Sequence, residues 1–172
     1  MKRTGYGIAL LFLFSCLCAQ QGPRIRELGE DFTYAGLEVL GPYAQMPQKI
    51  GELMAEVQKQ KLEMLDGPSI LYYNSPGQVR PEELRWEVLV PLHPLEKVAA
   101  PLKKGEFKYP TVAEFMYKGP YDSVSSAYPQ LMQFIAKSGY AVCGPICESY
   151  LDDPADTKPA DCRTLIVVPV KK

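Results

Sequence analysis

Apolar residues in this chain recur with two different periods, which predict helices and strands in alternation. Between Met46 and Leu65 the apolar positions recur every three or four residues, with glutamates and lysines between them. This stretch is predicted to be a helix, with Pro47 in its first turn, where proline is tolerated. Alternation from Leu84 to Leu92 predicts a strand with Trp86 on one face and Glu87 on the other. Two further strands are predicted over 32–40 and 69–73.

The second half of the chain shows the same succession of patterns. A strand over 107–117 is interrupted by Pro110, which predicts a bend or a late start, because proline cannot donate to a strand ladder. A helix follows, with Ser125 or Ser126 as its cap and Gly139 at its end. Strands over 146–151 and 163–170 complete this half.

The second half also repeats residues of the first at a spacing of 78. The matches are Gly41-Pro42-Tyr43 with Gly119-Pro120-Tyr121, and Pro81, Arg85 and Pro91 with Pro159, Arg163 and Pro169. Gly67-Pro68 returns as Gly144-Pro145, one residue short of that spacing, so we place a single-residue slip in the turn between 74 and 81. With this slip, Tyr73 corresponds to Tyr150 and Leu71 to Glu148.

These patterns together predict one α+β domain, residues 32–172, made of duplicated βαββ modules in repeats 32–92 and 105–170. Short links between neighbouring strands predict a largely antiparallel sheet with the helices on one face. Two copies are too few for a solenoid and indicate a pseudo-twofold pair. Because the seam between such modules is a common place for a ligand, we expect a cleft there.

The first 21 residues have the layout of a signal peptide. Lys2 and Arg3 precede an apolar run, Ile8–Leu17, which is short for a membrane span, and polar residues follow it. Leu13-Phe14-Ser15-Cys16 resembles a bacterial lipobox, in which Cys16 would be lipidated; cleavage near Cys18-Ala19 and a retained anchor are the alternatives. Residues 22–31 are predicted to be a polar tether. We expect an exported protein, periplasmic or a membrane-anchored lipoprotein if bacterial, and otherwise secreted.

Charge and composition exclude several classes of protein. The net charge is −1, or −3 without the two leader cations, and no basic run is present, so the chain has no electrostatic footprint for nucleic acid. His93 is the only histidine, which excludes multi-histidine metal sites and bis-histidine haem ligation within one chain. No cofactor is expected. Cys143, Cys147 and Cys162 are odd in number, and either one disulfide or three buried thiols fits the sequence.

The motifs of the second half resemble those of the GyrI-like small-molecule-binding family, whose domains also form the effector-binding half of AraC-type and MerR-type multidrug regulators. The matching stretches are Gly119-Pro120-Tyr121-Asp122, Ala127–Met132, Gly139-Tyr140, Gly144-Pro145, Glu148–Pro154, Arg163-Thr164 and Val168–Val170. The resemblance implies paired βαββ modules with a cleft at the seam, over roughly residues 32–170. It does not imply a regulator, because the chain has no helix-turn-helix segment and begins with an export leader.

In that family an acidic residue deep in the cleft faces lipophilic cations among aromatic rings, and Glu148 occupies the matching position. Ile146, Glu148 and Tyr150 alternate onto one face of their strand, so acid and ring point the same way. A buried carboxylate is costly unless a cation compensates it, and a lipophilic cation also gains from aromatic faces. Tyr73 and Tyr121 are further candidate ligand-binding residues. The alternative for Glu148 is a carboxylate at the rim, paired with Arg85, Arg163 or a lysine.

The sequence departs from the family pattern at Leu165, where many relatives carry an acid. The counterpart of Leu165 in the first half is Glu87, beside Trp86, which makes Glu87 a second candidate ligand carboxylate. An exposed strand carboxylate and a core tryptophan are the alternative interpretations of this pair.

Three functions fit these observations. The favoured one is an exported protein that binds amphipathic, cationic or aromatic small molecules between the two repeats. A hydrolase of reactive small molecules is the second, since some relatives are hydrolases; Glu148 or Glu87 would then activate water, which needs a raised pKa and reach to the substrate. A structural or protein-interaction domain with a filled seam is the third. The sequence does not identify the natural ligand or the oligomeric state.

Overall fold

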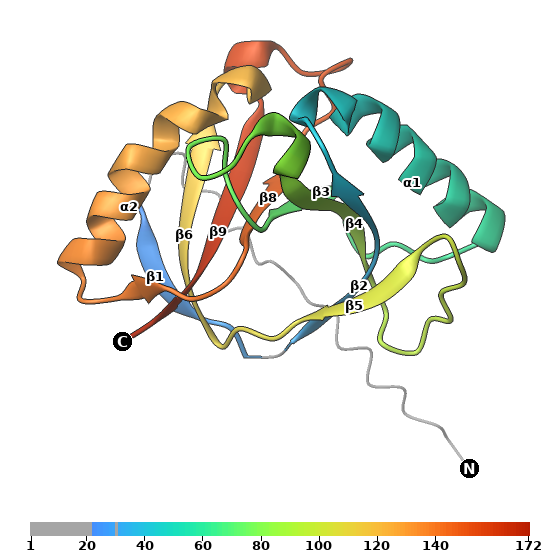
Figure 1. Cartoon of the computed structure of the whole chain (residues 1–172), viewed down its shortest axis with the longest axis horizontal. Coiled ribbons are helices and arrows are strands. Elements are labelled where there is room, and N and C mark those ends of the chain that lie inside the picture. Colours follow the sequence, from blue (N-terminus) through green and yellow to red (C-terminus); the bar gives the residue numbers. More distant parts are fainter. Residues whose placement is uncertain (1–21, 30) are drawn as a thin grey trace.

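The computed structural model describes residues 22–29 and 31–172, and the predicted leader with Cys16 lies outside these residues. The described chain forms a sheet with two α-helices (Figure 1). The strands are β1 (Arg24–Glu27), β2 (Phe32–Leu40), β3 (Ser69–Tyr72), β4 (Arg85–Leu92), β5 (Lys103–Phe107), β6 (Thr111–Lys118), β7 (Ala141–Val142), β8 (Ile146–Tyr150) and β9 (Arg163–Lys171). The helices are α1 (Met46–Gln60) and α2 (Tyr128–Lys137), and short 3₁₀ turns lie at 43–45, 81–83, 121–127 and 159–161.

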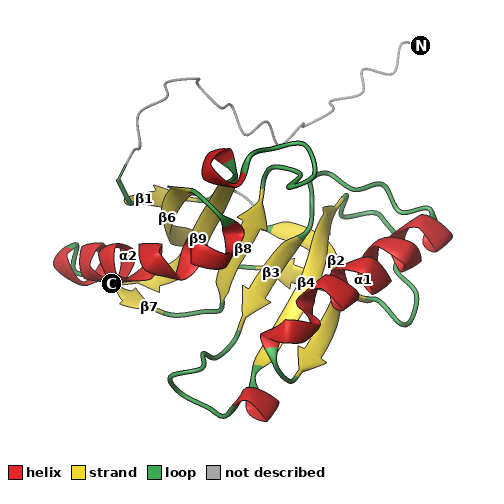
Figure 2. Ribbon diagram, turned by 90° about the horizontal axis from the view of Figure 1, so that it is seen from above, coloured by secondary structure: helices red, strands yellow, loops and turns green. Residues whose placement is uncertain are grey.

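The strands run in the order β1-β6-β9-β8-β3-β4-β2-β5, with β7 beside β9, and every pair is antiparallel. Strands β2, β3 and β4 occupy one side of the sheet and β6, β8 and β9 the other, and β3 and β8 join the two sides in the middle. The two outer strands are exchanged, because β1 pairs with β6 and β5 pairs with β2. Both helices lie on the same face, α1 over the first repeat and α2 over the second (Figure 2). The predicted α+β class and antiparallel sheet are confirmed.

Each helix buries its apolar stripe against its own half of the sheet. Leu53 and Val57 of α1 pack with Trp86, Val88 and Val90 of β4. In the second repeat, the corresponding core joins Leu131 and Ile135 of α2 to Ile166 and Val168 of β9. The alternate residues of the strands point to the opposite face, where a third apolar cluster includes Tyr34, Leu71, Leu89 and Phe107.

Residues 22–31, expected as a tether, contain a strand. Arg24–Glu27 pairs with β6, and Arg24 and Arg26 both pair with the buried carboxylate of Glu114. This segment is held in place by its pairing with β6 and by these two ion pairs. The predicted interruption at Pro110 separates two strands, β5 and β6.

The first helix ends five residues before the prediction. Lys61 adopts a left-handed conformation with φ of 56° and closes α1. Beyond it, Leu65 donates its backbone N–H to the carbonyl of Pro91 at 2.9 Å, and Met64 pairs with Leu92. The chain after Lys61 therefore runs beside β4 and does not extend the helix. Leu62 joins the core, whereas Met64 and Leu65 are exposed.

The strand pairing also corrects the alignment of the two repeats. Tyr72 pairs with Trp86, and Tyr150 pairs with Thr164, which lies 78 residues after Trp86. The counterpart of Tyr150 is therefore Tyr72 and not Tyr73, and the counterpart of Glu148 is Ile70 and not Leu71. The one-residue slip lies between Pro68 and Ser69, before the strand, and not in the turn after it.

One feature of the repeat has a direct backbone cause. Gly41 and Gly119, which open the duplicated Gly-Pro-Tyr motif, have φ values of 135° and 153°. Only glycine adopts this conformation readily, so each copy keeps a glycine where the chain turns from its first strand toward its helix.

The two cores place a large aromatic residue on different strands of the equivalent strand pair. In the first repeat the small Val39 pairs with the large Trp86, whose indole N–H donates to the carbonyl of Gly41 at 2.9 Å. In the second repeat the large residue is on the other strand, because Tyr117 pairs with Thr164. The Thr164 hydroxyl is buried and has no hydrogen-bond partner among the described residues. Each half thus pairs one aromatic residue with one β-branched residue, and the two residues occupy opposite strands in the two halves.

The three cysteines of the described chain are free thiols, and Cys147 and Cys162 are buried. Burial raises the pKa of the Cys147 thiol to about 12, so it behaves as an apolar core residue.

None of the helices in the described part of the chain is long and apolar enough to cross a membrane.

Candidate ligand-binding site

Glu148 lies at the seam, on the face that carries the helices. It is the middle residue of β8 and pairs with Ile70 of the first repeat on one side and with Ile166 on the other. Only 5% of Glu148 is exposed. Strand alternation places Ile146 and Tyr150 on the same face, as the sequence predicted. A carboxylate thus stands in the otherwise apolar middle of the sheet.

Three tyrosine hydroxyls donate to this carboxylate. Tyr128, the first residue of α2, donates to Oε1 at 2.5 Å. Tyr150 and Tyr72 donate to Oε2 at 2.9 and 3.1 Å, and their hydroxyl oxygens are 3.4 Å apart. Tyr72 comes from the first repeat, so both halves of the chain contribute to the same carboxylate.

These phenols remain protonated donors at neutral pH. Burial, reinforced by the charge of Glu148, raises the pKa of Tyr128 and of Tyr150 well above the ordinary value. Burial is also the main cause of the raised pKa of Tyr72, with Tyr150 and Glu148 adding to it. Glu148 forms no ion pair with a lysine or arginine of the described chain. The carboxylate is therefore stabilised by hydrogen bonds from phenols and not by a cation of the described chain.

Two further tyrosines, Tyr43 and Tyr121, complete a ring of aromatic groups. The Tyr43 ring meets the Tyr72 ring edge-on at 5.2 Å between centroids, and the Tyr121 ring meets that of Tyr150 at 4.8 Å. All five tyrosines of this cluster are half-buried: Tyr43, Tyr72, Tyr121, Tyr128 and Tyr150. We call them the tyrosine ring. It surrounds a carboxylate that is itself almost completely buried.

The outer two rings are fixed by the same hydrogen bond in each repeat. The hydroxyl of Tyr43 donates to the backbone carbonyl of Asn74 at 3.1 Å, and that of Tyr121 donates to the carbonyl of Asp152 at 2.5 Å. Asn74 and Asp152 are counterparts in the repeat, and each starts the loop of its own hairpin. Helix start and hairpin loop are thereby joined on both sides of the seam.

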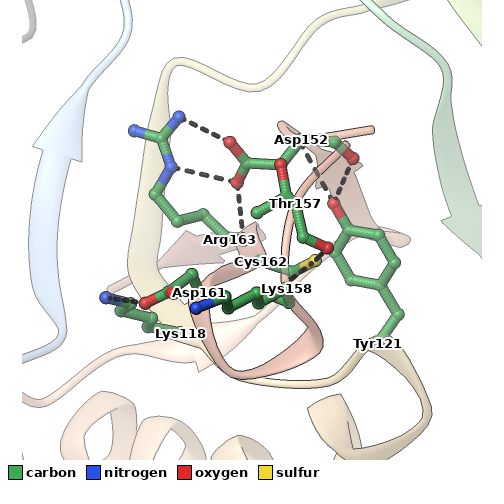
Figure 3. Close-up of polar contacts among 8 residues, drawn as sticks. All are labelled: Lys118, Tyr121, Asp152, Thr157, Lys158, Asp161, Cys162 and Arg163. Carbon is green, nitrogen blue, oxygen red and sulfur yellow. Dashed lines mark hydrogen bonds and ion pairs between the residues drawn. The ribbon is translucent and has the colours of Figure 1, made fainter. Parts of the chain in front are cut away.

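The second of these loops is further fixed by charge. Asp152 accepts the backbone N–H of Arg163 at 2.7 Å and pairs with its guanidinium at 2.9 and 3.0 Å (Figure 3). These hydrogen bonds hold the pKa of Asp152 below its usual value. In the same close-up, Lys118 pairs with Asp161 at 2.8 Å, which fixes the turn that precedes β9 (Figure 3). The wall of the site beside Tyr121 is therefore held by several polar contacts.

The structure brings together three of the residues predicted for the site, Glu148, Tyr150 and Tyr121. Trp86 is completely buried behind Tyr43, with 5.9 Å between the ring centroids. Tyr72, Tyr128 and Tyr43 were not predicted. The correct repeat alignment identifies Tyr72 as the counterpart of Tyr150, and Tyr43 follows in the same way from Tyr121. Tyr128 carries no such signal, because its counterpart on α1 is Ile50.

The other two predicted residues, Glu87 and Tyr73, lie together on the opposite face of the sheet. Glu87 is 4% exposed and accepts the hydroxyls of Tyr73 at 2.8 Å and Tyr34 at 3.2 Å. Gly36 makes room for it, because a Cβ there would overlap the carboxylate. Burial raises the pKa of Glu87. Arg85 stacks 4.6 Å above the Tyr73 ring and closes this second cluster.

The described residues contain no group of three or more histidine, cysteine or acidic side chains arranged to hold a metal ion. What the seam offers is a desolvated negative charge, hydrogen-bonded by neutral donors and surrounded by aromatic surface.

Comparison with known proteins identifies the family of this chain. The profile of the GyrI-like small molecule binding domain matches residues 22–171. The chain belongs to this family. No curated protein matches the chain. Among solved structures, the EcmrR C-terminal domain is similar with a TM-score of 0.71 at 23% identity, covering 87% of this chain and 97% of that one.

Two other solved structures with a similar fold carry descriptions of their own. A hydrolase encoded by lin2189 from Listeria innocua has a TM-score of 0.67 at 13% identity, covering 90% of this chain and 94% of that one. SAV2435 bound to tetraphenylphosphonium has a TM-score of 0.55 at 15% identity, covering 88% of this chain and 94% of that one. At these identities the similarity establishes the fold, and family membership establishes small-molecule binding as the general function.

Proposed function

We propose that this GyrI-like domain binds amphipathic small molecules at the seam, and that the ligand is a lipophilic cation. The observation that carries the proposal is Glu148, a buried carboxylate without a cation partner in the described chain. Burying a charge without an opposite charge is costly, and a cationic ligand removes that cost. The tyrosine ring adds apolar surface and the negative faces of aromatic rings, which attract cations.

The asymmetry of the seam supports one orientation of such a ligand. The counterparts of Glu148 and Tyr128 in the first repeat are Ile70 and Ile50, so the polar pair exists on one side only. A ligand with its charge toward β8 and its apolar body toward the first repeat matches this division. A neighbour in the same fold that binds tetraphenylphosphonium, a cation of this kind, supports the choice of chemistry.

The test is a titration of the purified protein with tetraphenylphosphonium, followed by calorimetry. We expect saturable binding that Glu148→Gln weakens by at least about tenfold, or about 1.4 kcal/mol, because glutamine keeps the shape and loses the charge. Glu87→Gln is the matched control, since it removes an equally buried carboxylate from the opposite face and should leave binding unchanged. Equal affinities for the wild type and Glu148→Gln would contradict the proposal.

We also propose that the protein is exported and tethered to a membrane by a lipid on Cys16. The support is the order of the leader: two cations, an apolar run and a lipobox-like Leu13–Cys16. In a bacterial host, the mass of the mature protein should correspond to a chain that begins at Cys16 and carries acyl groups. Cys16→Ala should release it from the membrane fraction. A mature chain beginning near Ala19 would instead show simple secretion.

A further inference from the structure

The hydrogen bonds around Glu148 leave little capacity for a ligand that donates hydrogen bonds. A carboxylate offers about four lone-pair positions. Three of them are occupied, one on Oε1 by Tyr128 and two on Oε2 by Tyr150 and Tyr72. The negative charge is therefore present, but its strong acceptor positions are mostly filled.

The outer tyrosines do not replace these acceptors. The hydroxyls of Tyr43 and Tyr121 donate to the backbone of Asn74 and Asp152, and the Tyr121 oxygen also accepts the N–H of Asp152 at 3.1 Å. Both hydroxyls are thus directed to the hairpin loops. What remains for a ligand is one carboxylate position on Oε1, ring surface and neutral phenol oxygens, which are weaker acceptors than a carboxylate.

A protonated primary amine and a quaternary cation differ in the number of hydrogen bonds that this site must accept from them. The ammonium group carries three N–H donors that are hydrogen-bonded in water, and each one left unpaired on burial weakens binding. A quaternary ammonium or phosphonium group has no N–H to satisfy. It retains the attraction of its charge to Glu148 and to the aromatic faces.

Resting on the proposed function, we infer that the site selects cations without N–H donors over protonated amines, and that Tyr128 sets this selectivity. Tyr128 is the residue that occupies Oε1, at the shortest of the three distances. It belongs to the acid-bearing repeat alone, because Ile50 stands at its counterpart on α1. The substrate class is therefore permanently charged, lipophilic onium compounds.

The experiment compares 4-phenylbutyltrimethylammonium with 4-phenylbutylammonium, which share one charge and one apolar body. We expect the wild type to bind the quaternary ligand at least about ten times more tightly. Tyr128→Phe keeps the ring and frees an acceptor position on Oε1, so it should improve the amine more than the quaternary ligand and reduce the affinity ratio by about threefold or more. The ratio of the two affinities is compared between the wild type and Tyr128→Phe. The extra apolar surface of the methyl groups contributes equally to this ratio in both proteins, so it does not affect the comparison.

Tyr150→Phe provides a second variant that frees a position on Oε2 instead, in case Tyr128→Phe is poorly folded. Equal affinity for the two ligands, or a ratio that neither variant changes, would overturn the selectivity while leaving ligand binding at Glu148 intact. If neither these ligands nor tetraphenylphosphonium binds the wild type, the proposed function itself fails. The two failures are therefore distinguishable within one series of titrations.

Discussion

Three glutamates of the described sheet are buried, and each is compensated by a different set of partners. Glu114 is paired with two arginines, Glu148 with three phenols, and Glu87 with two phenols. The two ion pairs of Glu114 connect β6 to β1. Glu148 and Glu87 accept hydrogen bonds from phenols and form no ion pair within the described chain, which separates them from Glu114.

Glu87 should make the protein more stable at mildly acidic pH. Burial raises its pKa in the folded chain above the reference value of 4.5. A raised pKa means that its contribution to stability is present below about pH 4.5 and is lost as the pH rises through the folded-state pKa. Urea unfolding of wild type and Glu87→Gln between about pH 4.5 and pH 7.5 measures this directly.

The free energy of unfolding of the wild type, relative to that of Glu87→Gln, should fall with increasing pH and then level off. Glu82→Gln, in an exposed turn, is the control and should show no such trend. A difference that rises with pH would mean that the phenols stabilise the ionised form by more than burial destabilises it.

At the scale of elements, β1 illustrates how a charged segment becomes a strand. Its sequence Arg-Ile-Arg-Glu has little strand propensity, and its place depends on the edge of β6 and on Glu114. Because both arginines are partly exposed, solvent screens these pairs and reduces their contribution.

Replacing Arg24 and Arg26 together with alanine should destabilise the protein by about 1–3 kcal/mol, since it leaves the Glu114 carboxylate buried without a cation. Chemical denaturation measures the loss. Adding Glu114→Gln should recover part of it, because glutamine carries no charge to compensate. Lys59→Ala, which removes an exposed pair on α1, should cost less than about 0.5 kcal/mol. A comparable loss in that control would contradict a specific role for Glu114.

Sequence patterns predicted the elements that depend on local chemistry. β2 follows from its run of apolar and small residues, and Glu148 and Tyr150 follow from alternation along β8. The patterns failed where contacts with residues distant in the sequence determine the position of a side chain. Tyr72 and Tyr73 are adjacent, and a slip of one residue moves a side chain to the other face of a sheet. The alignment therefore assigned Tyr73 to the seam, whereas the pairing of β3 with β4 places Tyr72 there. Tyr128 reaches Glu148 only because α2 packs over β8 and β9.

At the scale of the whole molecule, the two repeats have diverged in a paired manner. Val39 with Trp86 in one half corresponds to Tyr117 with Thr164 in the other, and Ile50 with Ile70 corresponds to Tyr128 with Glu148. In each case both partners differ together. A chain built from two copies of either half would therefore lose the asymmetric site, with no carboxylate at the seam in one version and two in the other.

The position of β3 beside β8 has a further consequence for how the protein is made. The two strands are far apart in the chain, and Tyr72 cannot reach Glu148 until the second half has been synthesised and has folded against the first. In the half-built chain the proposed binding site is therefore incomplete, and a ligand of that site would bind only the finished protein. At a concentration about a hundred times its Kd, such a ligand adds about 2.7 kcal/mol to the stability of the folded state. Under the proposed function, occupancy would therefore protect completed molecules from unfolding and would not protect incomplete ones.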